Sequence, residues 1–257
     1  MSAMSSGWTP ARAINYNIPA GDITLMQPHC TINVQRYRAV LFDLDGVITD
    51  TARLHYEAFR QTFSKLGLDI KPLDVYTREG MPSLEIGKSL VEEYGAHVDE
   101  EELKRTVEAK REFFRTLAEG NIKAYEGVPE TLAMLRQNGI KLGLVTGSNR
   151  TSVMKVISEA GLANMFDAIV TSGDTVRGKP YPDPYLQGMK MLGVDKEYSV
   201  VVENAPLGIK AARAAGAGFV IGVTTTLPEK YLAEADDVMP SFADLEKCLA
   251  GQMEQAP

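Results

Sequence analysis

The chain contains only two cysteines among its 257 residues, Cys30 and Cys248, and they lie far apart in the sequence. Two cysteines are too few for the disulfide framework of a small secreted domain, and neither has the neighbours that a zinc site requires at its usual spacings. We therefore expect two reduced thiols, as in a cytoplasmic protein.

Long apolar runs are also missing from the sequence. No segment approaches the ~20 apolar residues that a membrane-spanning helix needs. The N-terminus lacks the continuous apolar stretch of a signal peptide. We expect a cytoplasmic protein without a membrane partner.

Positive charge is in the minority, with 27 Lys and Arg against 34 Asp and Glu and a net charge of −7. An acidic chain of this kind argues against nucleic acid or an anionic membrane as the main partner. A small anionic ligand stays possible, because a bound cation can invert the charge of a local site.

The length suits a core of ordinary size with a smaller appended domain, since 257 residues are many for one domain and few for two large ones. Residues 1–36 differ from the rest, being punctuated by proline and glycine, and we interpret them as an N-terminal extension with a short strand pair at about 14–34. Residues 38–44 predict a buried strand. No strand signal follows until residue 120, and apolar residues at helical spacing predict helices from residue 52, at 83–94 and at 99–119.

From residue 127 onward, apolar segments alternate with helical patterns that end at glycines. The expected elements are helices at 129–138, 150–160, 184–192 and 207–215 and strands at 141–146, 168–171, 199–202 and 218–223. This alternation predicts βαβ units in a doubly wound α/β fold with a parallel sheet and an all-helical cap inserted after the first strand. The expected division is an extension at 1–36, a core at 37–51 and 121–250, a cap at 52–120 and a tail at 251–257.

The first predicted strand ends in two carboxylates, Asp43 and Asp45, followed by Gly46. Residues two apart in a strand point to the same face, so the carboxylates meet where the strand ends. Open α/β sheets bind their ligands at this edge. The pair is suited to holding a hard cation or attacking phosphorus.

Three further strand ends carry polar groups. Thr146-Gly147-Ser148 precedes a helix whose free amides can bind phosphate, although Ser148 or Asn149 could equally be a simple helix cap. Lys179 lies in a proline-rich loop that can fix its charge near a phosphoryl group, and the alternative is a solvated lysine. Glu203-Asn204 offers oxygens to Mg²⁺, and the alternative is an N-cap by Asn204.

With these four motifs in this order, the chain resembles the haloacid dehalogenase superfamily over residues 38–249, in the branch of β-phosphoglucomutases and phosphoglycolate phosphatases. The resemblance implies that Asp43 is a nucleophile that forms an aspartyl-phosphate and that Asp45 is the general acid and base. It implies phosphate contacts from Thr146, Gly147, Ser148 and Lys179. It also implies Mg²⁺ held by Asp43, the Asp45 carbonyl, Glu203 and Asn204.

The sequence departs from the family pattern in two places, the fourth motif and the cap loop. The fourth motif usually offers two acids, so Asn204 removes one negative charge, leaves Glu203 as the motif's only acid and predicts weaker Mg²⁺ binding. In β-phosphoglucomutases a lysine precedes the cap-loop glycine and an arginine follows three residues after it, whereas this chain has Glu79 and Ser83 there.

The missing basic residues favour transfer to water, and we expect a Mg²⁺-dependent phosphatase of a small phosphorylated metabolite, of sugar phosphate or phosphoglycolate type. A hexose-phosphate mutase and a non-catalytic phosphate-binding protein are the alternatives. From the cap we expect substrate contacts at His55, Arg78 and Gly80, with His55 equally able to be a packing residue at the core interface.

Overall fold

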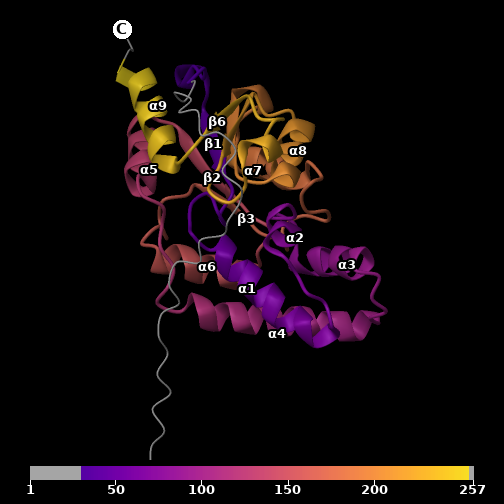
Figure 1. Ribbon diagram of the computed structural model, residues 1–257. Coiled ribbons are helices and arrows are strands. Elements are labelled where there is room, and N and C mark those ends of the chain that lie inside the picture. Colours follow the sequence, from indigo (N-terminus) through magenta and orange to yellow (C-terminus); the bar gives the residue numbers. More distant parts are fainter. Residues whose placement is uncertain (1–29, 255–257) are drawn as a thin grey trace, which may run out of the picture.

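The computed structural model describes residues 30–254 as an α/β core with a group of helices beneath one edge of its sheet (Figure 1). The six-stranded sheet is parallel, with the order β3-β2-β1-β4-β5-β6. Its strands are β1 Ala39–Phe42, β2 Lys141–Val145, β3 Ala168–Val170, β4 Ser199–Glu203, β5 Phe219–Val223 and β6 Asp237–Met239.

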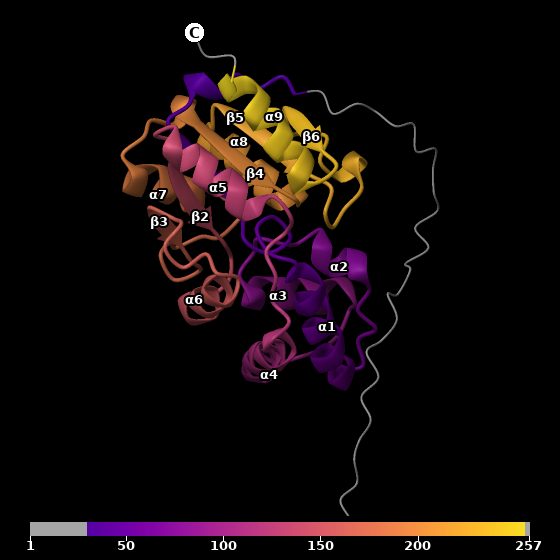
Figure 2. The same cartoon turned by 90° about the vertical axis from the view of Figure 1, so that its left-hand side faces the viewer.

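Both faces of the sheet are covered by helices, which explains the continuous apolar strands. Helices α5 Val128–Gln137, α6 Arg150–Glu159 and α9 Phe242–Glu254 contribute to the apolar cluster on one face. Helices α7 Asp183–Leu192 and α8 Pro206–Ala215 cover the other face (Figure 2). In β1, Val40 and Phe42 pack toward the first cluster and Ala39 and Leu41 toward the second.

The chain reverses its direction across the sheet at β1 and β4, which are adjacent although they are distant in sequence. Phe42 pairs with Leu144 of β2 and with Val202 of β4. Because these strands are in register, the residues that follow them emerge together at one edge. This is the switch point at which open α/β sheets bind ligands.

The expected helical insertion is confirmed. Between β1 and α5 lie α1 Ala52–Phe63, α2 Pro72–Tyr76, α3 Ser83–Glu93 and α4 Glu100–Ala118, and within residues 52–120 the structure has no strand. These helices, here called the cap, have an apolar core of their own that includes Phe59, Phe63 and Leu90. None of the helices in residues 30–254 has the length and apolar character needed to cross a bilayer.

Among the α-helices and strands of residues 30–254, three were not predicted: α2, β6 and α9. The five residues of α2 and the three of β6 are too short to show a period. Helix α9 runs to Glu254, so it includes the first residues of the expected tail. The strand pair expected at about 14–34 lies mostly outside the described residues, and Val34–Arg36 is a 3-10 helix.

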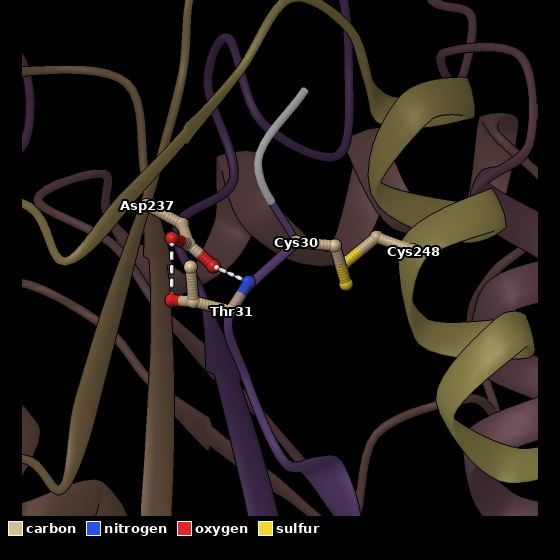
Figure 3. Close-up of a disulfide and its surroundings, with 4 residues drawn as sticks. All are labelled: Cys30, Thr31, Asp237 and Cys248. Atoms are coloured by element: carbon tan, nitrogen blue, oxygen red, sulfur yellow. Dashed lines mark hydrogen bonds between the residues drawn. A yellow bond between two sulfur atoms is a disulfide. The ribbon is translucent and has the colours of Figure 1, made fainter. Parts of the chain in front are cut away.

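The expectation of two reduced thiols is wrong, because Cys30 and Cys248 form a disulfide across 218 residues (Figure 3). Ile32 and Val34 are buried in the same apolar cluster as α9, and both Thr31 donors bond to the Asp237 carboxylate at 2.8 and 2.7 Å. These contacts bring Cys30 to α9. A single long-range pair has no spacing pattern in the sequence, so counting cysteines missed it.

We predict that reduction of this disulfide lowers the free energy of unfolding by about 2–4 kcal/mol, because the cross-link restricts the unfolded chain. Urea unfolding of the wild type with and without a thiol reductant measures the change. Cys248→Ser is the control, and its unfolding is expected not to respond to reductant. A wild-type midpoint that reductant leaves unchanged would contradict the prediction.

Candidate active site

A buried lysine joins the first and fourth strand ends. Lys179 Nζ donates to Asp43 Oδ1 at 2.6 Å, to Glu203 Oε1 at 2.6 Å and to the Val145 carbonyl at 2.9 Å. The three acceptors use all three hydrogens of the ammonium group. Lys179, Asp43 and Glu203 are each no more than 2% exposed, so the alternative of a solvated lysine is excluded.

Glu203 is turned toward this lysine by its own neighbours. Its Oε1 also accepts from the Tyr185 hydroxyl at 2.6 Å, and its Oε2 accepts from the backbone N–H of Asn204 at 3.1 Å. Gly208 in the first turn of α8 lies against the carboxylate, which a Cβ there would overlap. Glu203 therefore positions Lys179 in this structure, and its role as a metal ligand stays a prediction.

Asp45 lies at the centre of a second group of donors. Its Oδ1 accepts from Thr51 Oγ1 at 2.6 Å and lies 3.1 Å from His55 Nε2. Its Oδ2 accepts from Ser148 Oγ at 3.1 Å and from Thr146 Oγ1 at 3.4 Å. Two of the residues expected to bind phosphate thus lie within hydrogen-bonding distance of the expected general acid.

The helix that follows Ser148 is capped by the next residue. Asn149 accepts from the N–H of Ser152 at 3.1 Å and is the N-cap of α6. Ser148 is thereby free to face the site, which decides between the two alternatives in the second motif. In the fourth motif Ala205, not Asn204, is the N-cap of α8, so the Asn204 side chain is also directed elsewhere.

The two aspartates differ in their electrostatic environment. Burial raises the pKa of Asp43 above its ordinary range, although the Lys179 ammonium lowers it, and the Glu203 and Asp45 carboxylates add to the rise. Burial opposes ionisation of Asp45 as well, but His55 together with the hydroxyls of Thr51 and Ser148 holds its pKa below the ordinary range. The structure therefore stabilises Asp45 as a carboxylate.

The cap contributes a buried lysine that was not predicted. Lys110 of α4 is 1% exposed, lies 4.5 Å from the Phe59 ring centroid and donates to His55 Nδ1 at 2.7 Å. Burial lowers its pKa to about 7. Lys110 falls at helical spacing on the buried stripe of α4 that also contains Leu103, Val107, Phe114 and Ala118, and this spacing is a sequence signal that could have found it.

A small cavity lies between the core and the cap. Its polar lining comes from Asp45, Thr146, Gly147 and Ser148 of the core and from His55, Glu79, Ser83 and Lys110 of the cap. The cap loop between α2 and α3 touches the core here. A Cβ at Gly147 would overlap the Gly80 carbonyl, and a Cβ at Gly80 would lie 2.6 Å from Lys179 Cδ.

Of the three cap contacts expected, the structure brings His55 and Gly80 to the cavity but not Arg78. The Arg78 guanidinium donates to Ser89 Oγ at 2.9 Å, to the Asp74 carbonyl at 2.7 Å and to Glu93. All of these belong to the cap, so Arg78 braces α2 against α3 instead of lining the site.

Glu79 takes the place expected for Arg78. It is 5% exposed and accepts from Asn204 Nδ2 at 2.7 Å. Burial and the nearby Asp43 and Asp45 carboxylates raise its pKa well above the ordinary range. The sequence comparison with mutases had noted this residue only as the absence of a lysine.

The oxygens between Asp43 and Asn204 fit a Mg²⁺ ion. Asp43 Oδ2, Asn204 Oδ1 and Glu79 Oε1 are buried and have no hydrogen-bond partner in the described part of the chain, and the Asp45 carbonyl lies 3.3 Å from Asn204 Nδ2. Carboxylate, carbonyl and amide oxygens are the ligands that Mg²⁺ accepts. Residues 30–254 contain no cage of three or more His, Cys, Asp or Glu side chains, so the fit also depends on the carbonyl and on Asn204.

The fold and this arrangement define a class of hydrolase, and comparison with known proteins agrees. The profile of haloacid dehalogenase-like hydrolases matches residues 40–222. The chain belongs to the haloacid dehalogenase-like hydrolases and is a phosphoric monoester hydrolase. This sets aside the non-catalytic alternative.

Among its relatives, the phosphorylated carbohydrates phosphatase of Thermotoga maritima is 34% identical over 211 residues, which is 78% of this chain and 92% of that protein. The fructose-1-phosphate phosphatase of Escherichia coli is 31% identical over 183 residues, covering 71% and 94% of the two chains. The β-phosphoglucomutase structure from Clostridium difficile superposes with a TM-score of 0.75 at 30% identity, covering 85% and 98%.

We predict that Gly147→Ala lowers kcat/KM for phosphate release by about 100-fold, because the added methyl prevents the close approach of the Gly80 carbonyl and displaces the cap. Steady-state kinetics measure the loss. Gly173→Ala is the matched control, since nothing lies within 4 Å of a Cβ there. Equal kinetics for the two variants would contradict the closed contact.

We predict that below pH 7 Lys110→Met raises the free energy of unfolding by on the order of a few kcal/mol relative to the wild type. This gain becomes progressively smaller toward pH 10. The folded-state pKa of Lys110, about 7, lies below its ordinary 10.5. Between these values the unfolded chain binds a proton that the folded chain does not, so wild-type stability rises with pH.

Urea unfolding of both proteins from pH 6 to pH 10 tests this difference. Lys88→Met, at an exposed position on α3, is the control and is expected to show no such trend. A stability difference that is constant with pH would refute the lowered pKa of Lys110.

Proposed function

We propose that the protein is a Mg²⁺-dependent phosphatase that hydrolyses a small phosphorylated metabolite, of sugar phosphate or phosphoglycolate type, through an aspartyl-phosphate on Asp43. The observation that carries this proposal is the Asp43 carboxylate itself. One of its oxygens is held by Lys179 at 2.6 Å, and the other has no hydrogen-bond partner among the described residues.

In the first step an oxygen of Asp43 forms a bond to phosphorus while the bond from phosphorus to the leaving oxygen breaks. A bound phosphate dianion raises the pKa of a neighbouring carboxyl, so Asp45 takes up the proton that it then donates to the leaving oxygen. Thr146 and Ser148, which bond to Asp45 in this structure, would turn their hydroxyls to the phosphoryl oxygens.

In the second step Asp45, again a carboxylate, takes a proton from water as the water oxygen attacks phosphorus. The bond between Asp43 and phosphorus breaks, and inorganic phosphate leaves. His55 and Thr51 favour this ionised form of Asp45 and fix its orientation.

Charge repulsion between the anionic nucleophile and the anionic phosphate opposes the first step. Lys179 offsets part of it as a fixed ammonium group. Mg²⁺ bound by Asp43, the Asp45 carbonyl and Asn204 would neutralise the rest of the charge that develops on the phosphoryl oxygens. The cap excludes bulk water from this group of charges.

We propose that the phosphoryl group is transferred to water. The cap loop has no basic residue at the two positions where β-phosphoglucomutases carry a lysine and an arginine. A mutase must hold the far phosphate of a bisphosphate, and Glu79 and Ser83 offer no positive charge to hold it. The two phosphatase relatives support the same choice. The hexose-phosphate mutase remains the second candidate, favoured by the likeness to a β-phosphoglucomutase structure. We also propose a cytoplasmic site of action; the Cys30–Cys248 disulfide counts against this location, because thiols in the cytoplasm are usually kept reduced.

We predict that Asp43→Asn reduces phosphate release from a panel of sugar phosphates and phosphoglycolate by at least about 10⁴-fold, because the amide is no nucleophile. A colorimetric phosphate assay measures the loss, with Asp195→Asn at an exposed position as control. Activity that survives in Asp43→Asn would reject Asp43 as nucleophile. Isomerised sugar phosphate without released phosphate in the wild type would reject hydrolysis in favour of the mutase.

A further inference from the structure

The amide of Asn204 has more acceptors around it than it has hydrogens. Asn204 Nδ2 lies 2.7 Å from Glu79 Oε2, 2.9 Å from Thr226 Oγ1 and 3.3 Å from the Asp45 carbonyl. An amide nitrogen carries only two hydrogens. This part of the site therefore has more oxygen acceptors than hydrogens to bond to them, which is an environment that suits a cation.

The distribution of unsatisfied atoms points to the same place. In the described part of the chain, four buried side-chain N or O atoms have no hydrogen-bond partner. Three of them are oxygens of Asp43, Glu79 and Asn204, and the fourth is the hydroxyl of Thr131 on α5. Buried polar atoms are almost always satisfied, so three orphaned acceptors at one site indicate a missing positive partner.

Glu79 is the carboxylate whose charge is otherwise unexplained. Lys179 forms ion pairs with Asp43 and Glu203, and Asp45 accepts a hydrogen bond from His55. Within residues 30–254, Glu79 makes no ion pair. It is only 5% exposed, and the nearby Asp43 and Asp45 carboxylates repel its negative charge. Burying a carboxylate without a cation is unfavourable.

Glu79 reaches the site from the other domain. It lies in the cap loop between α2 and α3, whereas Asn204 follows β4 in the core. Gly80, the next residue, contacts Lys179 and Gly147 of the core. The carboxylate of Glu79 is therefore present at the site only while the cap is closed.

We propose that Glu79 is an acidic residue of the Mg²⁺ site that is contributed by the cap, replacing the negative charge that Asn204 does not supply. Mg²⁺ then binds more tightly to the closed form and holds the cap against the core. Thermodynamic linkage makes the effect mutual, so closure raises the affinity for Mg²⁺ by the same factor. The inference rests on the proposed function, because it assumes that the ion used is Mg²⁺.

The first test measures Mg²⁺ binding directly by isothermal titration calorimetry, without substrate. Glu79→Gln keeps the shape and removes the charge, and we expect the dissociation constant to rise about 10–100-fold. Glu85→Gln, the same change at an exposed position on the cap, is the matched control and is expected to bind as the wild type does. Equal affinities of Glu79→Gln and the wild type would overturn the proposal.

A double variant separates loss of charge from loss of fold. Glu79→Gln combined with Asn204→Asp reverses the amide–carboxylate pair and returns the charge to the site. We expect its Mg²⁺ affinity to come within about threefold of the wild type, given the usual context dependence of such pairs. A double variant that binds Mg²⁺ as weakly as Glu79→Gln would overturn the exchange of charge between the two positions.

The second test follows the cap itself. Hydrogen exchange of the peptide spanning residues 76–84 is expected to slow when Mg²⁺ is added to the wild type and to be unaffected by Mg²⁺ in Glu79→Gln. Identical Mg²⁺ responses in the two proteins would show that Glu79 does not link the ion to the cap. A raised KM with unchanged Mg²⁺ affinity would instead make Glu79 a substrate contact.

Failure of this inference is distinguishable from failure of the proposed function. If the wild type binds Mg²⁺ and releases phosphate while Glu79→Gln binds Mg²⁺ equally well, only the inference falls. If the wild type neither binds Mg²⁺ nor needs it to release phosphate, both fall.

Discussion

The buried ammonium of Lys179 is the interaction on which the site depends. It draws Asp43 from the end of β1 and Glu203 from the end of β4 to one point, and both partners are almost fully inaccessible to solvent. Removing one member of such a group leaves an uncompensated buried charge, which costs about 3–5 kcal/mol. Lys179 lies on a loop between β3 and α7, so the contact also fixes that loop against the centre of the sheet.

The second constraint is steric, and it lies between the core and the cap. Gly147 lets its backbone meet the backbone at Gly80, where a Cβ would overlap, and Gly80 lies directly against the side chain of Lys179. This approach places the cap residues His55, Lys110 and Glu79 above the core carboxylates. The site is thus built from two domains whose polar groups satisfy one another: His55 bonds to Asp45, and Glu79 bonds to Asn204.

Much of the core half of the site could be predicted, because the carboxyl ends of parallel strands lie at one edge of the sheet and each motif directly follows a predicted strand. Asp43, Asp45, Thr146 and Lys179 lie together as the motifs predicted. The cap half was predicted poorly. Arg78 and Glu79 are adjacent in sequence, and only the path of the loop decides that the glutamate faces the core while the arginine pairs with Glu93.

The sequence by itself determined the alternation of strands and helices, the helical insertion and the acidic end of β1, since each depends on patterns within a few residues. Only the tertiary structure decided that Cys30 meets Cys248, that Lys110 is buried beside His55 and that Glu203 turns to Lys179. These contacts join segments 24 to 218 residues apart. Tertiary packing decides which residues meet in these contacts, and the local hydrophobic periodicity of the sequence carries no information about it.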